Sequence, residues 1–319
     1  MATVTACSTL AFSLSSLETA LQHISGYGFG RVEISDQLTH SQHFSTDVSR
    51  PVDPHEVHAL LARYALVPVA ANCTLATFFS ADQPDLQRAA PELQSSAETE
   101  EIKRAKADLV IYRLHEPIQA KAYRRRARKL IDNAQIAGIP MVCLEGGARS
   151  QIDDIDTELR AAAGVIDEQA EYARKAGIKI LLEMPHVWDL YYDADKARQM
   201  LSYLESDNVG VVLDSTHWHT SGYEIDAYVR FLKDRLWHVH LRDAAGKDSP
   251  KGDYELEKTP GKGEVDFGLL GETLDKYGYQ GNVTLETEYK NYHDVTEVDV
   301  ENRFAIEHLK SVGWDVALR

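Results

Sequence analysis

The sequence has no long run of apolar residues, although 44% of its 319 residues are hydrophobic. A membrane-spanning helix needs about 18 consecutive apolar residues, so we expect no membrane protein. The first basic residue is Arg31, so the charged start of a secretory signal is missing. We therefore expect a cytoplasmic location.

Cysteine is scarce, with only Cys7, Cys73 and Cys143. Their number is odd, and each is far from the others in an apolar stretch. This pattern favours reduced, buried thiols over disulfides or a zinc cluster.

Basic residues are also few, because 34 Lys and Arg oppose 50 Asp and Glu and leave a net charge of −16. Binding to a nucleic acid requires a basic surface that neutralises phosphates, so no nucleic-acid partner is expected. One stretch is densely basic, and we interpret it as the solvated face of a helix rather than a phosphate or partner site. It contains Lys121, Arg124, Arg125, Arg126, Arg128 and Lys129.

Short apolar runs alternate with amphipathic segments along the whole chain. The runs predict eight strands, at 4–10, 31–35, 67–72, 139–144, 178–184, 210–214, 237–241 and 283–287. The segments between them predict helices, among them 16–25, 54–64, 123–137, 157–176, 194–205, 225–234 and 267–277. Eight βα units in a chain of this length predict a single α/β domain over 1–319, a parallel eight-stranded (β/α)8 barrel.

Two segments do not fit this regular count. The segment 74–119 is too long for one loop of the barrel, and its apolar part 109–114 could be a ninth strand or part of a helix. We favour a helix within an insertion. The segment 244–259 is polar, and we predict a long loop that either closes over the site as a lid or stays solvated.

Acidic residues and His follow four consecutive predicted strands. Glu183 ends one apolar run, Asp214 ends the next with His217 three residues later, and His240 and Glu286 lie at the ends of the last two. The carboxyl ends of barrel strands form one face, where the chemistry of such barrels takes place. Two Glu, one Asp and one His make a hard donor set, which suits Mn²⁺ or Mg²⁺ better than a closed zinc site.

Strand alternation leaves a choice between neighbouring residues. His238 and His240 share a face of their strand, but His240 is closer to the strand's end. We therefore expect His240 in the site and His238 in a hydrogen-bonded layer below it. By the same argument we choose Glu286 over Glu288.

Several motifs together resemble the xylose-isomerase-like TIM-barrel superfamily, which includes sugar isomerases and epimerases as well as the endonuclease IV type (AP endonuclease family 2). The motifs are Leu-Glu at 182–183, Leu-Asp-Ser-Thr-His at 213–217, His-Leu-Arg-Asp at 240–243, Pro-Gly-Lys-Gly-Glu-Val-Asp-Phe at 260–267 and Leu-Glu at 285–286. The resemblance implies a metal ion held by Glu183, Asp214, His240 and Glu286, with His217 beside it.

The chain departs from the endonucleases of this superfamily. These bind three zinc ions through extra His ligands and an Asp-x-His pair, whereas the corresponding strand ends here read Ala-Asn-Cys-Thr at 71–74 and Leu-Glu-Gly-Gly at 144–147. No Asp-x-His occurs between Asp243 and Pro260. Nuclease activity is therefore the weakest of the enzymatic readings.

The remaining four-ligand set is similar to that of the ketose 3-epimerases. The resemblance implies removal of a proton next to the carbonyl of a ketose or keto-sugar through a metal-stabilised enolate, with Glu183 and Glu286 as acid and base and His217 as a donor to the oxyanion. Those epimerases have a Glu and an Arg where this chain has Asp189 and Gly246, which puts simple ketose specificity in doubt.

Two alternative functions stay open. Inosose dehydratases and catalytic subunits of C-glycoside deglycosidases are similar to this chain, and they imply a β-elimination on an inosose or 3-keto glycoside, with His186 as the general base or as a rim residue. The chain could instead be a non-catalytic sugar-binding or assembly subunit. We expect a homo-oligomer, to which a small second subunit could add. Rim or aromatic residues without an assigned role are Glu33, Glu145, Arg242, Trp188, Trp218, Tyr191 and Tyr192.

Overall fold

The structure is a computed structural model of the 319-residue chain. It describes residues 2–37, 41–45, 52–75, 77–78, 109–110, 112–115, 117–149, 155–232, 234–248, 254–289 and 291–319.

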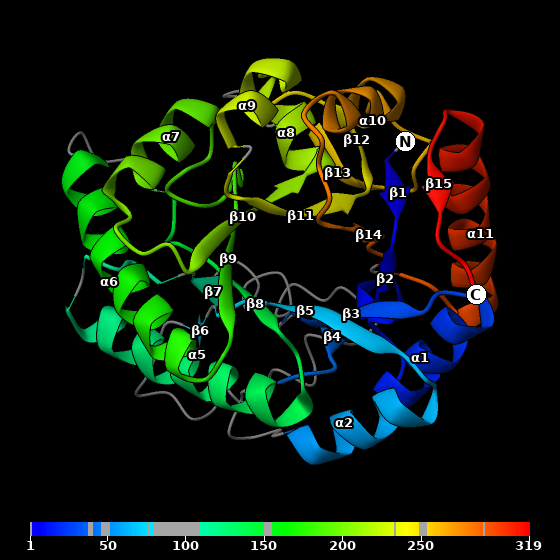
Figure 1. The fold of residues 1–319 in the computed structure, drawn as a ribbon, viewed down its shortest axis with the longest axis horizontal. Coiled ribbons are helices and arrows are strands. Elements are labelled where there is room, and N and C mark those ends of the chain that lie inside the picture. Colours follow the sequence, from blue (N-terminus) through cyan, green and yellow to red (C-terminus); the bar gives the residue numbers. More distant parts are fainter. Residues whose placement is uncertain are drawn as a thin grey trace.

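A closed barrel of eight parallel strands forms the centre of the molecule (Figure 1). Each strand pairs in parallel with its neighbours, and pairing between the first and second strands completes the ring. In chain order the strands are β2 (Ala6–Ser8), β3 (Arg31–Gln37), β5 (Val67–Cys73), β8 (Met141–Leu144), β9 (Lys179–Glu183), β10 (Val209–Asp214), β11 (Leu236–Leu241) and β14 (Asn282–Leu285). All eight predicted strands, and the (β/α)8 barrel itself, are confirmed.

Helices surround the barrel on its outer side (Figure 1). They are α1 (Leu17–Gly26), α2 (Pro54–Arg63), α5 (Pro117–Ala137), α6 (Ile155–Lys175), α7 (Ala194–Tyr203), α9 (Ile225–Leu232), α10 (Phe267–Lys276) and α11 (Val295–Ser311). Several begin at a polar residue whose side chain accepts a hydrogen bond from the first turn, as Ser16, Asp53 and Asp193 do. Two shorter helices, η1 (Thr9–Phe12) and α8 (Ser215–Ser221), follow β2 and β10 directly.

Short strands complete the architecture at the edges. β4 (Ser41–Gln42) pairs antiparallel with β3. β1 (Thr3–Val4) pairs in parallel with β15 (Asp315–Val316), so the first and last strands lie side by side (Figure 1).

The two irregular segments differ from their predictions. β6 (Thr77–Phe78) pairs antiparallel with β7 (Leu109–Val110), and 112–115 are not helical, so the helix favoured for 109–114 is wrong. A short apolar run fits a strand and a buried helix equally well, which explains the error. Residues 79–108 of the predicted insertion lie outside the described residues.

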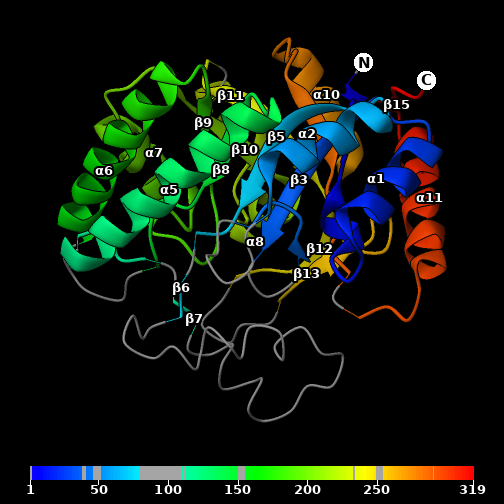
Figure 2. The same ribbon diagram turned by 90° about the horizontal axis from the view of Figure 1, so that it is seen from below.

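The second segment is a β-ribbon rather than a simple loop. β12 (Asp243–Gly246) pairs antiparallel with β13 (Tyr254–Lys258), in which buried Leu256 alternates with exposed neighbours. The view in Figure 2 places β6, β7, α8, β12 and β13 on the same side of the barrel, the side at which the strands end. That this ribbon acts as a lid stays a prediction.

The interior contains the three cysteines. Cys7, Cys73 and Cys143 are buried and free, so the reading as reduced core thiols is confirmed. Among the described residues, no helix combines the length and apolar character that crossing a membrane would require.

Candidate active site and metal centre

The structure brings the four strand-end residues together inside the carboxyl end of the barrel. Glu183, Asp214 and His240 each offer a ligand atom, and these atoms lie within 4.8 Å of one another. Glu286 follows β14, and its Oε2 lies 3.0 Å from His240 Nδ1, while Glu183 Oε2 lies 3.9 Å from the same nitrogen. All four residues are buried. The barrel therefore concentrates three carboxylates around one imidazole.

Arg242 enters the same cluster, although the sequence assigned it no role. Its Nε donates to Asp214 Oδ2 at 3.0 Å and its Nη1 donates to Glu288 Oε2 at 2.7 Å. The guanidinium also lies 4.0 Å from Glu183 and 3.9 Å from Glu286. The guanidinium of Arg242 therefore places a permanent positive charge beside these carboxylates. Arg242 follows β11 directly, two residues after His240, so the alternation of an extended chain could have placed them on the same face.

Asp214 is held rigidly because it also begins a helix. Its Oδ1 accepts hydrogen bonds from the backbone N–H of Thr216 at 2.6 Å and of His217 at 3.0 Å, as an N-cap residue does. Burial alone would raise the pKa of Asp214, but the positive charge of Arg242 holds it below its usual value. Asp214 is thus ionised and oriented at once.

A second layer lies beneath His240. Glu33 Oε2 lies 3.1 Å from His240 Nε2 and 2.9 Å from His238 Nε2, and Thr284 Oγ1 is 2.9 Å from the same His238 atom. The hydrogen-bonded position expected for His238 is therefore observed. Burial would raise the pKa of Glu33, but the two imidazoles lower it below its usual value.

His217 is the neighbour expected beside the ligands. Its Nε2 accepts a hydrogen bond from Arg242 Nη2 at 3.1 Å, because a guanidinium can only donate, and it lies 3.4 Å from Glu183 Oε1. Burial, and then the charge of His186, lower the pKa of His217 well below its usual value. A neutral ring that accepts at Nε2 carries its proton on Nδ1, so Nδ1 is the atom that could donate to a substrate.

His186 packs against His217, with ring centroids 4.1 Å apart. Its Nδ1 lies 3.3 Å from Asp189 Oδ1, and Asp189 is buried. Burial lowers the pKa of His186, but the Asp189 carboxylate outweighs it and raises this pKa to about 9. Asp189 stands where the resembling epimerases have a Glu, and here it orients a histidine.

Two further polar residues support the rim. Asn72 Nδ2 donates to Glu286 Oε1 at 2.8 Å and so fixes one oxygen of that carboxylate. Glu145 Oε2 accepts from the backbone N–H of Leu75 at 2.6 Å. Burial, followed by the charge of Asp189, raises the pKa of Glu145 to about 7. Asn72, in β5, is a site residue that the sequence analysis missed, since a lone Asn near the end of a strand carries no signal of its own.

The aromatic candidates divide into two groups. Tyr191 and Trp218 are buried and pack within the core, whereas Trp188 is 49% exposed. Trp188 stands edge-on to His186 and to His217, with ring centroids 5.6 and 6.1 Å away. It is thus the aromatic residue of this group that a substrate could touch.

The donor set fits one divalent ion. In the described part of the chain, Glu183 Oε1 and His240 Nδ1 are buried and take part in no hydrogen bond, although burying such atoms unpaired is costly. Burial, and then the charge of Asp214, raise the pKa of Glu183 to about 8. These hard oxygen and nitrogen donors could hold a metal ion.

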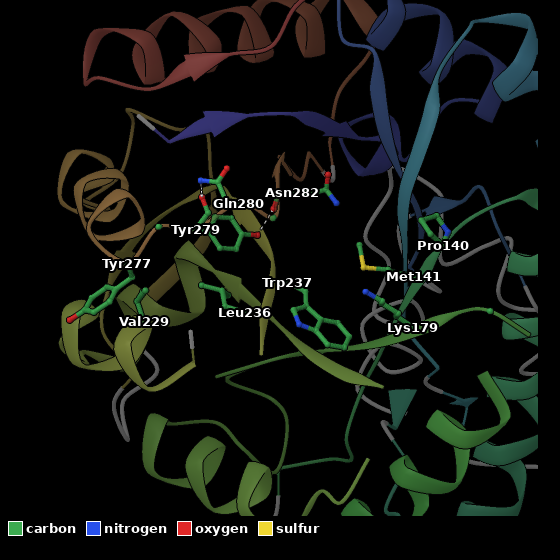
Figure 3. A pocket seen from close by; sticks show the side chains of 13 residues that line it. Pro140, Met141, Lys179, Val229, Leu236, Trp237, Tyr277, Tyr279, Gln280 and Asn282 are labelled. Atoms are coloured by element: carbon green, nitrogen blue, oxygen red, sulfur yellow. Dashed lines mark hydrogen bonds between the residues drawn. The ribbon is translucent and has the colours of Figure 1, made fainter. Parts of the chain in front are cut away.

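A separate cavity of about 540 Å³ lies at the opposite end of the barrel (Figure 3). It is lined by Met141, Lys179, Leu236, Trp237 and Asn282, which lie at the beginnings of β8, β9, β11 and β14. Buried Leu181 and Val212 fill the barrel between it and the acidic cluster. This cavity is therefore not part of the candidate active site.

Curated relatives are carbohydrate enzymes. An inosose isomerase of Halalkalibacterium halodurans is 25% identical over 171 residues, which are 53% of this chain and 58% of that protein. A D-psicose 3-epimerase of Ruminiclostridium cellulolyticum is 25% identical over 123 residues, 38% of each chain. An inosose dehydratase of Lacticaseibacillus casei is 21% identical over 144 residues, 42% of this chain and 48% of that one. The chain thus spans about half the length of the curated relatives that it matches.

A solved structure of the IolI protein with a bound zinc atom superimposes with a TM-score of 0.69 at 17% identity and covers 96% of this chain and 98% of its own. At this identity the likeness shows the fold. The family model of the xylose isomerase-like TIM barrel matches residues 21–311, nearly the whole chain. The protein therefore belongs to the xylose isomerase-like TIM-barrel family.

Proposed function

We propose that the protein is a divalent-metal-dependent isomerase or epimerase that removes a proton next to the carbonyl of a ketose or keto-sugar. The observation that carries the proposal is the pair Glu183 and Glu286, whose Oε2 atoms lie 3.9 and 3.0 Å from the same nitrogen of His240. Two carboxylates thus face one position for a cation. Proton removal and return on two sides of a carbon needs such a pair.

Glu183, Asp214, His240 and Glu286 would hold the ion, which we propose to be Mn²⁺ or Mg²⁺ because three of the four donors are carboxylates. When bound, the ion would polarise the carbonyl and the neighbouring hydroxyl of the sugar and so make the adjacent C–H more acidic. The IolI structure, whose fold resembles that of this chain, contains a bound zinc atom, which supports a metal site in this protein.

The side chains divide the proton transfer between them. Asn72 fixes Glu286 Oε1, which keeps that carboxylate in one orientation. Glu183 Oε1 accepts no hydrogen bond among the described residues, so this oxygen is available to a proton from carbon. His217 would donate from Nδ1 to the substrate oxygen on which negative charge develops.

Solvent deuterium exchange tests this proposal. Glu286→Gln is expected to keep the fold but to lose deuterium incorporation into a keto-sugar by at least about 10²-fold, because an amide cannot take up the proton. Glu272→Gln on the exposed side of α10 is the control and should exchange like the wild type. Exchange at the wild-type rate in Glu286→Gln would contradict the proposal.

The second candidate is β-elimination from an inosose or 3-keto glycoside, and the pair His186 and Asp189 favours it. This pair supplies a histidine beside the acidic cluster, oriented by a buried carboxylate. The same carboxylate raises the pKa of His186 to about 9, so the ring would act as a general base only in its neutral form, which is favoured at high pH. The relative named inosose dehydratase supports the same reading. Elimination would yield an enone or a released aglycone, detectable by ultraviolet absorbance or mass, and His186→Ala should abolish it. If His186→Ala retained full elimination, this assignment of the base would be wrong.

A further inference from the structure

Glu33 is far in sequence from the four proposed ligands, but its side chain contacts one of them, His240. It is the third residue of β3, is 1% exposed, and its Oε2 lies 3.1 Å from His240 Nε2. The same oxygen lies 2.9 Å from His238 Nε2. One buried carboxylate oxygen thus binds the two histidines of β11.

The chemistry of these groups determines how the His240 ring must be arranged. An ionised carboxylate can only accept hydrogen bonds, so the Nε2 of His240 that faces Glu33 must carry a hydrogen. Glu286 Oε2 faces Nδ1 in the same way, so in the absence of an ion this atom too can carry a hydrogen. With an ion bound, Nδ1 would give up that hydrogen and present its lone pair, whereas Nε2 would keep the hydrogen that it donates to Glu33. Nδ1 faces Glu286 Oε2 at 3.0 Å and Glu183 Oε2 at 3.9 Å, so its lone pair would point among the other proposed ligands.

We propose that Glu33 is a positioning residue that fixes the tautomer and ring orientation of His240, so that Nδ1 faces the ion, and thereby sets the affinity of the site for a divalent metal. A carboxylate bound to the far nitrogen of a metal-ligating histidine acts in this way. The inference rests on the proposed function in one respect, that His240 is a ligand.

The same atoms permit another arrangement, which the experiment must exclude. Glu33, His238 and His240 together could hold an ion of their own, because their ligand atoms lie within 4.8 Å of one another. We favour the positioning role because each of these contacts already has hydrogen-bond length, and Thr284 Oγ1 also lies 2.9 Å from His238 Nε2.

Titration of chelator-treated protein with Mn²⁺ by calorimetry tests the proposal. We expect one ion per wild-type chain, and an affinity weakened by about 10- to 100-fold in Glu33→Gln. Glu288→Gln is the matched control, because Glu288 is another buried carboxylate beside the cluster, but it binds Arg242 and not His240. If only the lost negative charge mattered, the Mn²⁺ affinity would fall equally in both variants. If the orientation of His240 matters, the affinity falls more in Glu33→Gln.

A second readout needs no metal. Long-range ¹H–¹⁵N spectra of histidine-labelled wild type, with the His240 signals assigned through His240→Asn, should show a hydrogen on Nε2 of His240. The same spectrum of Glu33→Gln should show a mixture of tautomers, and that of Glu288→Gln should be unchanged.

Equal Mn²⁺ affinities in the two variants, two ions per wild-type chain, or a His240 ring without a hydrogen on Nε2 would each overturn the proposal. Failure of the proposed function has a different signature. If the wild type bound no Mn²⁺ while its His240 kept the Nε2 hydrogen held by Glu33, the metal assignment would fail and the contact would stand.

Discussion

Replacing Arg242 by Met is expected to destabilise the metal-free protein. Arg242 is almost fully buried, and its donors hold Asp214 Oδ2 at 3.0 Å, Glu288 Oε2 at 2.7 Å and His217 Nε2 at 3.1 Å. Methionine fills a similar space but leaves two carboxylates without their cation. Removing one partner of a buried ion pair costs about 3 to 5 kcal/mol of the free energy of unfolding.

This cost converts into a melting temperature. An unfolding entropy of about 2.1 cal/mol/K per residue gives about 0.7 kcal/mol/K for this chain, so the expected decrease is about 4 to 7 °C. Burial already raises the pKa of Glu288 to about 7, so this carboxyl can take up a proton when Arg242 is removed. Protonation removes its unpaired charge, so the decrease in melting temperature should lie towards the lower end of this range. Differential scanning calorimetry in a chelating buffer measures the decrease.

A matched exposed pair provides the control. Arg63 lies on the surface beside Glu18, and losing such a pair costs at most about 1 kcal/mol, so Arg63→Met should melt within about 2 °C of the wild type. Added Mn²⁺ should raise the melting temperature of Arg242→Met more than that of the wild type, because the ion no longer competes with the guanidinium. An Arg242→Met protein that melts at or above the wild-type temperature in chelator would refute the reasoning.

Three further predictions concern packing and pH. A Cβ on Gly210 would lie 2.1 Å from the Trp237 ring, so Gly210→Ala should lose about 1 to 3 kcal/mol in denaturant unfolding. Gly164 in α6 has nothing within 4 Å of its Cβ position, so Gly164→Ala should instead gain about 0.5 to 1 kcal/mol. The pKa of Glu145 is raised from 4.5 to about 7, so the folded state retains its proton more tightly, and the resulting stability is lost as pH rises through this window. Relative to Glu145→Gln, the wild type should therefore lose stability from about pH 5 to 7, by at most about 1.4 kcal/mol per pH unit, and an unchanged difference would contradict the pKa.

The strands of the barrel could be predicted because each is a short apolar run, and a buried parallel strand needs little else. The meeting of Glu183, Asp214, His240 and Glu286 followed from the same reasoning, since the ends of parallel strands form one face. Segment 109–114 could not be decided, because its strand partner at Thr77–Phe78 lies far away in the sequence. The hairpin of β12 and β13 could not be predicted, because its residues are mostly polar and show no apolar strand pattern.

The roles of Glu33 and Arg242 depend on contacts that no sequence pattern carries. Glu33 lies 207 positions from His240, and only the closed barrel brings them together. Arg242 comes directly after β11, two residues from His240, but its partners Asp214 and Glu288 come from other segments of the chain. In the sequence, Asp189 stands where the ketose 3-epimerases have a Glu. Only the structure shows that its carboxylate lies beside His186.

The most direct test of the central claim is deuterium wash-in from D₂O into a panel of ketoses, inososes and 3-keto glycosides, measured by mass while Mn²⁺ is returned to the chelated protein. The account predicts that at least one of these substrates gains deuterium next to its carbonyl, and that the rate rises with Mn²⁺ and saturates near one ion per chain. Exchange that proceeds equally without the ion would contradict it.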